Sequence, residues 1–352
     1  MKKLMFLFSV MIFLVACDSS NGTSETNKKV SITAAGATFP MPFYNMVFKK
    51  YTKSTGILLT YGGIGSGGGI RSLKDKIVDF GATDAFLSDE KMKDMPAEIV
   101  HVPTCLGAVV IAYNLQGVDS IRLTNKLLEG IFMGEITRWD DKKIAENNPS
   151  ISLPDTKITV VHRSDGSGTT FIFSDFMSKI SNKWKDAVGR GKSLKWPTGL
   201  GAKGNPGVAG TIGQTNGAIG YIGSEYAFAQ KIPVAQIRNK SGNYIKPSVG
   251  SISASAKGNI PADTRVMITN PDDPDAYPIS GFTWIILYKD QSYDGRSKLQ
   301  AQETVKFLNW LLSKDAQDVT KKVNYSPLPE SLVIKAKNIL KSIHYNGETL
   351  KQ

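Results

Sequence analysis

The chain has 352 residues, 41% of them hydrophobic, which suffices for two domains with apolar cores and excludes an intrinsically disordered protein. The formal net charge is +12 at pH 7, but the lysines are spread along the chain and no basic-aromatic nucleic-acid motif occurs. We therefore expect a globular protein with a solvated basic surface and no nucleic-acid partner. Such a charge favours the approach of anions and of acidic lipid head groups.

The first sixteen residues are typical of a signal peptide. Lys2 and Lys3 precede an apolar run, residues 4–16, that is too short to span a bilayer. The run leads into LVAC, residues 14–17, which resembles the lipobox of bacterial lipoproteins. We expect the segment 1–16 to be removed and the thiol of Cys17 to carry a diacylglyceryl group, with palmitate among its acyl chains. A plain secretory signal with a chance cysteine is the alternative.

Residues 17–30 form a polar stretch that contains DSSNGTSETNKK and cannot bury apolar area. We predict a lipidated, disordered tether between the membrane and the folded part of the chain. A multiply acylated terminus holds a membrane far more firmly than a single acyl chain does. The expected location is the cell envelope, with the protein anchored on the extracytoplasmic, periplasmic side of the membrane.

The rest of the chain alternates short β-rich runs with helical patterns, which is typical of an α/β protein. The first set has strands at 29–37, 57–65 and 78–84 and helices at 40–56 and 69–77. A second set follows a strand at 101–114, with helices at 124–136 and 168–180, a strand at 157–163 and the segment 205–223. A strand at 281–289 and a long amphipathic helix at 303–323 close the series. In the helix at 40–56, we expect one face to hold Phe43, Met46, Val47 and Tyr51.

Cys105 is the only cysteine besides Cys17, and it lies in the apolar run TCLGAVVIAY. With Cys17 lipidated, Cys105 has no partner for an internal disulfide, so we expect a buried free thiol. An apolar strand raises the pKa of a thiol, which disfavours the alternative of a catalytic nucleophile.

Three loops share one design, because each joins a strand to a helix and is rich in Gly, Ser or Thr. They are GATFP at 36–40, GIGSGGG at 63–69 and DGSGTT at 165–170. Such loops present free backbone N–H groups and hydroxyls at a helix N-terminus, where partial positive charge gathers. Any one of them is equally well explained as an ordinary helix cap or turn. Three together, with Arg163 beside the third, favour an anion-binding site.

Other anion-handling and catalytic motifs are excluded by single positions. The GKS at 191–193 is no P-loop, because Asp186 stands where the first glycine is required. Ser66 and Ser167 do not form a hydrolase elbow, because Ile64 and Asp165 replace the first glycine of G-x-S-x-G. The chain has three histidines, widely spaced, which indicates neither a metal cluster nor a Ser-His pair.

Several segments far apart in the sequence carry a family resemblance: AGATFPMPFY, YGGIGSGGGIRSL, VDFGATDAFLSDEK, HRSDGSGTTFIF, KWPTGLGAKGNPGVAG, GAIGYIG and NYSPLP. In order and spacing the chain resembles the phosphate-binding protein of the high-affinity phosphate ABC importer, between about Ser31 and about Leu332. The third glycine of GSGGG departs from that pattern at a tolerant position. The resemblance implies a two-lobed periplasmic-binding-protein fold. Each lobe is then a doubly wound sheet flanked by helices, with the ligand in the cleft between lobes.

The resemblance also implies the phosphate-binding residues: Thr38, Phe39 through its backbone N–H, Ser66, Asp84, Arg163, Ser167, Gly168 and Thr169. Asp84 is expected to accept the hydrogen bond from the proton on phosphate, and Arg163 to donate charge-assisted bonds. Asp165 is expected to pair with Arg163 and hold it in position. A dehydrated oxyanion needs every oxygen satisfied, which accounts for the many donors of the third loop.

The implied lobes are discontinuous, with residues 31–105 and 270–352 in the first and 106–269 in the second. Hinge crossings are expected near Thr104 and Ile279. The ligand then favours the closed state, because only closure joins the two half-sites.

The resemblance implies a monomeric binding protein, not an enzyme, that uses no cofactor or metal and delivers phosphate to a membrane permease and its ATPase. One alternative is a phosphatase acting on esters, which the lack of an activated nucleophile in the sequence disfavours. A second alternative is a surface adhesin or sensory lipoprotein that has kept the fold.

Overall fold

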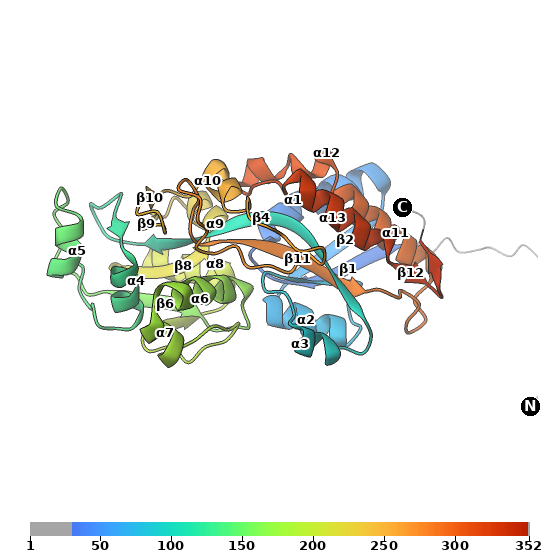
Figure 1. Ribbon diagram of the computed structural model, residues 1–352, viewed down its shortest axis with the longest axis horizontal. Helices are drawn as coiled ribbons and strands as arrows, with labels where there is room; N and C mark the ends of the chain where they lie inside the picture. The colour runs from blue at the N-terminus through green and yellow to red at the C-terminus, as the bar shows by residue number, and fades with distance from the viewer. Residues whose placement is uncertain (1–29, 351–352) are drawn as a thin grey trace, which may run out of the picture.

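The short apolar runs of the sequence pair into one mixed sheet of eight strands. The computed structural model describes residues 30–350, with the strands in the order β2-β1-β3-β11-β4-β8-β6-β7 (Figure 1). Their bounds are β1 (Ser31–Gly36), β2 (Leu58–Gly63), β3 (Phe80–Thr83), β4 (Ile99–Tyr113), β6 (Thr159–Arg163), β7 (Leu200–Ala202), β8 (Ala218–Gly223) and β11 (Ser280–Tyr288). β1 is parallel to β2 and β3, and β6 is parallel to β7 and β8. The predicted α/β class is confirmed.

The first half of the molecule is built on β1, β2 and β3, with helices from both ends of the chain. These are α1 (Met41–Thr55), α2 (Ser66–Lys74), α3 (Asp89–Lys93), α11 (Lys298–Leu311), α12 (Lys314–Gln317), the 3-10 helix η1 (Thr320–Val323) and α13 (Glu330–Lys341). A small hairpin of β12 (His344–Tyr345) and β13 (Glu348–Thr349) follows. Figure 1 shows the blue N-terminal and red C-terminal helices together on this half.

Helix α1 shows how the sequence sets a buried face. Proline in its first turn suits a position whose N–H has no helical partner, and Gly56 ends the helix in the left-handed conformation. Its buried residues are Phe43, Tyr44, Val47, Phe48 and Tyr51. The prediction that Met46 shares this face is wrong, because Met46 lies beside the stripe and is 40% exposed.

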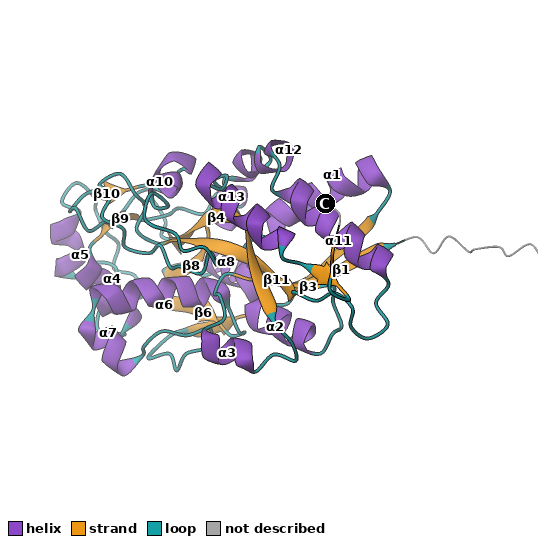
Figure 2. Ribbon diagram, turned by 45° about the vertical axis from the view of Figure 1, so that its right-hand side comes forward, coloured by secondary structure: helices purple, strands orange, loops and turns teal. Residues whose placement is uncertain are grey.

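The second half is built on β6, β7 and β8. Its helices are α4 (Asn125–Phe132), α5 (Lys142–Asn147), α6 (Gly168–Ile180), α7 (Asn182–Ala187), α8 (Gly204–Gln214), α9 (Ser224–Ala229) and α10 (Val249–Ala254). A separate small sheet consists of β5 (Arg122–Leu123), β9 (Gln236–Arg238) and β10 (Tyr244–Ile245). In Figure 2, α6 runs along one face of this half.

Strands β4 and β11 connect the two halves. β4 pairs with β11 up to Ala108 and with β8 from Val109 onward, so one strand belongs to both halves. β11 is buried at every position, and both strands run across the middle of the molecule (Figures 1 and 2). The main hydrophobic core is accordingly continuous from one half to the other.

The predicted long helix at 303–323 is wrong, because this segment forms three elements, α11, α12 and η1. Ser313 caps a new helix by accepting a hydrogen bond from the N–H of Ala316. The side chain of Gln317 donates to the carbonyl of Leu311 (2.9 Å) and to that of Thr104 (3.0 Å). Local capping and a bond to β4 therefore override the amphipathic periodicity.

The predicted signal peptide, Cys17 and the tether up to residue 29 lie outside the described residues. Of the helices formed by residues 30–350, none is both long enough and apolar enough to cross a membrane.

Gly69 marks the closest approach of α2 to the sheet. A Cβ atom at Gly69 would lie 2.6 Å from the Cα of Gly36 and 2.7 Å from the carbonyl oxygen of Ala35. Because these are backbone atoms, Gly69→Ala should lower the free energy of unfolding by about 1–3 kcal/mol. The control is Gly210→Ala in α8, where nothing lies within 4 Å, and it should raise the free energy of unfolding by about 0.5–1 kcal/mol. Urea unfolding followed by circular dichroism measures both, and equal effects would contradict the assignment.

Candidate functional site

The structure brings the three glycine-rich loops together between the two halves. The first loop joins β1 to α1, the second joins β2 to α2, and the third joins β6 to α6. The N–H of Gly67 donates to the carbonyl of Gly166 (2.8 Å), and the N–H of Gly168 donates to Ser66 Oγ (3.1 Å). A Cβ atom at Gly67 would lie 3.3 Å from the Cα of Gly166, so the loops touch backbone to backbone. Helix N-termini from both halves thus converge on one cluster.

Three tyrosine hydroxyls fix the peptide groups of the first loop. Tyr61 donates to the carbonyl of Ala37 (2.6 Å) and Tyr226 donates to that of Thr38 (2.5 Å). A further tyrosine, Tyr325, donates to the carbonyl of Phe39. Burial raises the pKa of all three phenols, which keeps them neutral donors.

The loop therefore has its carbonyl groups occupied, while the N–H groups of Thr38 and Phe39 stay available. No acceptor among the described residues takes the backbone N–H of Thr38 or of Phe39. The ring of Phe39 is fully buried and lies against Tyr325 with ring centroids 6.0 Å apart. Phe39 thus offers the site its backbone alone, which agrees with the role that the resemblance implies.

Three hydroxyl groups in the cluster accept hydrogen bonds and keep their own protons. Thr38 Oγ1 accepts from the backbone N–H and the side-chain amide of Asn205, both at 3.1 Å. Ser66 Oγ accepts from the N–H groups of Gly168 and Asp84. Thr169 Oγ1 accepts from Arg163 and Asn205. Because a hydroxyl has one proton and its acceptor capacity is used here, each of the three is set to donate to an anion.

Asp84 brings an unpaired acceptor oxygen into this donor-rich cluster. Its side chain follows β3, is 1% exposed, and accepts from the hydroxyl of Thr283 at Oδ1 (2.6 Å). The other oxygen, Oδ2, is buried and has no partner among the described residues. A Cβ atom at Gly168 would lie 2.6 Å from Oδ2, so this oxygen faces the start of α6. Burial raises the pKa of Asp84 to about 7, although the bond from Thr283 and the charge of Arg163 oppose that shift.

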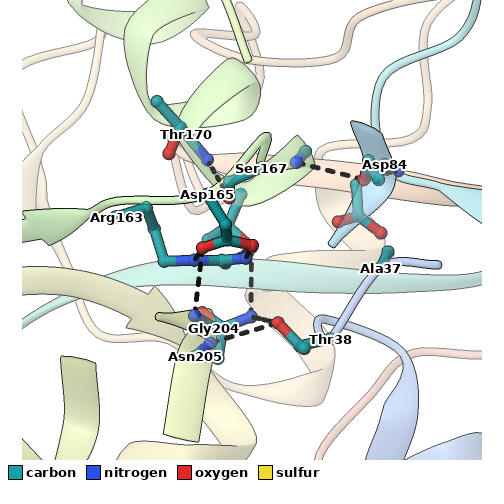
Figure 3. A network of polar contacts seen from close by, with 12 residues as sticks. Ala37, Thr38, Asp84, Arg163, Asp165, Ser167, Thr170, Gly204 and Asn205 are labelled. Carbon is teal, nitrogen blue, oxygen red and sulfur yellow. Dashed lines mark hydrogen bonds and ion pairs between the residues drawn. The ribbon is translucent and has the colours of Figure 1, made fainter. Parts of the chain in front are cut away.

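Arg163 and Asp165 form a bidentate ion pair, shown face to face in Figure 3. Nε and Nη2 of Arg163 lie 2.7 and 2.6 Å from the two carboxylate oxygens. The N–H of Gly204 adds a bond to Asp165 Oδ1 (3.0 Å). Burial disfavours the charged carboxylate, but the bonds and charge of Arg163 outweigh it and lower the pKa of Asp165. The remaining nitrogen, Nη1, reaches Thr169 Oγ1 at 3.3 Å. The pair thus has the arrangement expected from the resemblance.

The hydroxyl groups of the third loop have different roles. Ser167 Oγ caps α6 by accepting from the N–H of Thr170 (3.0 Å), and Thr170 Oγ1 bonds the hydroxyl of Tyr221 (2.7 Å). All of the residues that the resemblance implies, from Thr38 through Thr169, therefore lie in or beside the cluster, with Ser167 occupied in part as a helix cap.

Sequence reasoning missed Asn205, which joins the two halves. It is fully buried at the start of α8, and its side-chain amide donates to Thr38 of the first half (Figure 3). The same amide donates to Thr169 of the second half. Its Oδ1 accepts from the N–H of Gly223 (3.1 Å). The residue lies in KWPTGLGAKGNPGVAG, but one sequence carries no sign that it meets a threonine so distant along the chain. The roles of Tyr226 and Tyr325 were not predicted from the sequence, for the same reason.

The geometry of the described residues suits the binding of an anion through hydrogen bonds. Cys105 is fully buried and unpaired, as predicted, and burial raises the pKa of its thiol. Within residues 30–350, no three His, Cys, Asp or Glu side chains gather as a metal site would require. A surface hollow of about 830 Å³ between α4, α5 and the end of α6 shares no residue with the cluster.

Comparison with known proteins agrees with this geometry. A family model described as a PBP superfamily domain matches residues 21–315. The phosphate-binding protein PstS of Haemophilus influenzae is 39% identical over 319 residues, which cover 89% of this chain and 93% of the relative. That of Xylella fastidiosa is 38% identical over 316 residues, which cover 88% and 85%. The chain belongs to the PstS family.

The fold of this PstS-family chain is shared with solved structures. The high-affinity periplasmic phosphate-binding protein PfluDING, solved with bound phosphate, matches with a TM-score of 0.68 and 22% identity. The match covers 88% of this chain and 93% of that one. The predicted family and the predicted periplasmic-binding-protein fold are confirmed. PstS-like proteins bind their substrate and are not enzymes, so that prediction is confirmed as well.

Proposed function

We propose that this protein captures inorganic phosphate between its two halves and delivers it to a phosphate ABC permease and its ATPase. The observation that carries the proposal is the convergence of three donor-rich loops on one buried free acceptor, Asp84 Oδ2. The names of the PstS relatives and the phosphate bound in PfluDING support the same ligand.

Hydrogen bonds carry the binding more than net charge does, because the charge of Arg163 is matched by Asp165. The proposed donors are the N–H groups of Phe39 and Ser66, the hydroxyls of Thr38, Ser66, Ser167 and Thr169, and the guanidinium of Arg163. Gly168 contributes by donating its N–H to Ser66 Oγ, which leaves the hydroxyl proton of Ser66 for the ligand. Asp84 Oδ2 accepts the proton that phosphate keeps at neutral pH. A tetrahedral oxyanion with one proton then has every oxygen satisfied without water.

We further propose the lobes as 31–105 with 270–352 and 106–269, and closure of the cleft about their two crossings. Support comes from β4, which changes its pairing partner between Ala108 and Val109. It comes also from the bonds of Asn205 and Tyr226, which reach from the second lobe to Thr38 in the first. Such bonds form only in a closed cleft, so they add to whatever the ligand contributes to closure.

The anchor is a proposal of its own. The lipobox at residues 14–17 supports acylation of Cys17 and attachment to the extracytoplasmic face of a membrane. A tether reaching to residue 30 leaves the cleft free to meet a permease in the same membrane. We propose a monomer, since the proposed site is complete within one chain.

Tryptophan fluorescence and hydrolysis assays test the function. Trp196 stacks on His162 with ring centroids 4.6 Å apart, next to Arg163, so closure should change its emission. Phosphate should give a saturable change, and no phosphate should be released from esters over hours. Arg163→Ala should weaken phosphate binding by about 1.5–3 kcal/mol, because charge-assisted bonds are lost and Asp165 is left unpaired.

The control for that variant is Arg238→Ala, which removes the same charge from an exposed position at the end of β9 in the second half. It should leave the affinity within about twofold, as expected for a surface substitution. A protein that shows no phosphate-dependent signal by fluorescence or calorimetry, or that hydrolyses esters, would contradict the proposed function.

Asp84→Asn tests selectivity against sulfate. Sulfate carries no proton at neutral pH, so one of its oxygens would face Asp84 Oδ2 with no hydrogen between the two acceptors. Sites of this kind bind the wrong ligand roughly 10⁴ to 10⁵ times more weakly than the right one. The amide keeps an acceptor for phosphate and adds an N–H for sulfate. We expect retained phosphate binding and new sulfate binding, measured by competition at fixed ionic strength. Asp119→Asn, at an exposed site, is the control. If sulfate competes no better against Asp84→Asn than against wild type, Asp84 is not the selectivity element.

Cys17→Ala tests the anchor. We expect the variant to move from the membrane fraction to the soluble fraction while its phosphate affinity stays unchanged, because the site lies wholly within residues 38–205. Fractionation with immunoblotting and calorimetry on the soluble protein measure the two properties. Membrane retention equal to that of wild type would count against the lipobox.

A further inference from the structure

Glu225 is a second buried carboxyl group at the same interface, and the proposed binding set does not use it. It lies in the first turn of α9, directly after β8, and is 4% exposed. Neither of its oxygens has a hydrogen-bond partner among the described residues, and the hydroxyl of the neighbouring Ser224 also lacks one. A buried carboxylate without partners is strongly unfavourable, and burying the neutral acid costs much less.

The carboxyl group lies against residues that hold the closed cleft together. It folds back over Gly223, where a Cβ atom would lie 2.2 Å from Oε1. The N–H of Gly223 orients the amide of Asn205, which bonds Thr38 across the interface. The next residue, Tyr226, donates to the carbonyl of Thr38. Glu225 is therefore packed where the two halves meet.

The groups around Glu225 offer it no positive charge. Two of the nearby groups are the carboxyl group of Asp84, directly after β3, and the neutral thiol of Cys105 in β4. The other two are phenols, that of Tyr325 in the C-terminal segment and that of Tyr226 in the same helix as Glu225. The adjacent β8 carries Tyr221, and α8 has no ionisable side chain. Arg163 is committed to Asp165. Tyr325 already donates its proton to the carbonyl of Phe39.

We propose that Glu225 takes up one proton from solvent when the cleft closes over phosphate and holds it as a neutral carboxylic acid until the cleft reopens. The inference rests on the proposed function. On closure an O–H bond forms at one carboxylate oxygen, and on opening the proton returns to solvent. Closure brings Asp84 and Tyr325 of the first half over α9 and removes water from Glu225. A charged Glu225 would then stand beside Asp84 and a phosphate anion with no cation to balance it.

The sign of the pH dependence follows from this coupling. Burial raises the pKa of Glu225 to about 8 in the closed form, the charge of the nearby Asp84 adds to the shift, and neighbouring polar groups offset only part of it. If the pKa of a group is higher in the bound form than in the free form, its protonation contributes to the free energy of binding. This contribution is complete at pH values below the free-form pKa, and it is lost as the pH rises through the bound-form pKa. Phosphate affinity should therefore fall between neutral pH and about pH 8 in a way that depends on Glu225.

Calorimetry on the full chain tests the coupling, with inorganic phosphate as the titrant. Titrations at pH 7 in two buffers of different protonation enthalpy count the protons taken up per phosphate bound. Wild type should take up about one proton more than Glu225→Gln, and its affinity should fall roughly twentyfold more between pH 6.5 and 8.5. The control is Glu330→Gln, which removes an exposed carboxylate at the start of α13 and should behave as wild type.

The outcomes separate this inference from the proposed function. If wild type and Glu225→Gln both bind phosphate with equal proton uptake and equal pH slopes, the coupling is wrong and the phosphate-binding function stands. If wild type binds no phosphate, the function itself fails.

A measurement on wild type alone covers the case in which Glu225→Gln does not fold. Infrared difference spectra at pH 7 should show a protonated carboxylic acid band on adding phosphate. The band should shift when the protein contains ¹³C-labelled glutamate, which distinguishes Glu225 from Asp84. Absence of a glutamate-dependent band would overturn the proposal.

Discussion

The buried cluster between the two halves holds more carboxyl groups than guanidinium groups, and this imbalance limits how an anion can be held there. Among the described residues, the carboxyl groups of Asp84, Asp165 and Glu225 lie there with one guanidinium, that of Arg163. Arg163 is already paired with Asp165. Since an unpaired charge is strongly unfavourable in such a place, an anion has to be held by oriented dipoles and by hydroxyl protons. Three helix N-termini and three hydroxyls with occupied acceptors meet that need.

Orienting those dipoles requires contacts far from the ligand. A backbone N–H points into a site only if the rest of its loop is held, and Tyr61, Tyr226 and Tyr325 hold the first loop by its carbonyl groups. Tyr226 comes from the opposite half, so part of the first loop's order depends on a contact with the other half. The long strand β4, shared by both halves, keeps the two sets of loops facing each other. The position of the loops in the sheet and the hydrogen bonds from the tyrosines therefore both determine how the N–H groups of the first loop are oriented.

The local features of this site were predictable from the sequence, and the long-range ones were not. The loops at 36–40, 63–69 and 165–170 have a glycine-rich composition that needs no tertiary information to interpret. Asn205 is 167 residues from Thr38 in the sequence, and Tyr325 is 286 residues from Phe39, so neither spacing leaves a local pattern. The break between α11 and α12 was missed for the opposite reason, because amphipathic periodicity continued through a serine cap. Helical periodicity placed Met46 one position off the buried stripe.

In the proposed site, the contrast between the many donors of the three loops and the one acceptor oxygen of Asp84 that faces them limits which ligand would bind. An anion that lacks a proton leaves Asp84 Oδ2 unpaired, and an anion with several protons sets O–H groups against N–H and O–H donors. An oxyanion with the right proton but longer bonds satisfies every partner, so hydrogen bonding cannot exclude it. Only shape can do that, and the halves meet closely where the N–H of Gly67 donates to the carbonyl of Gly166. A Cβ atom at either glycine would lie 3.3 Å from the Cα of the other, so a side chain at this contact would shift the two backbones by a few tenths of an ångström.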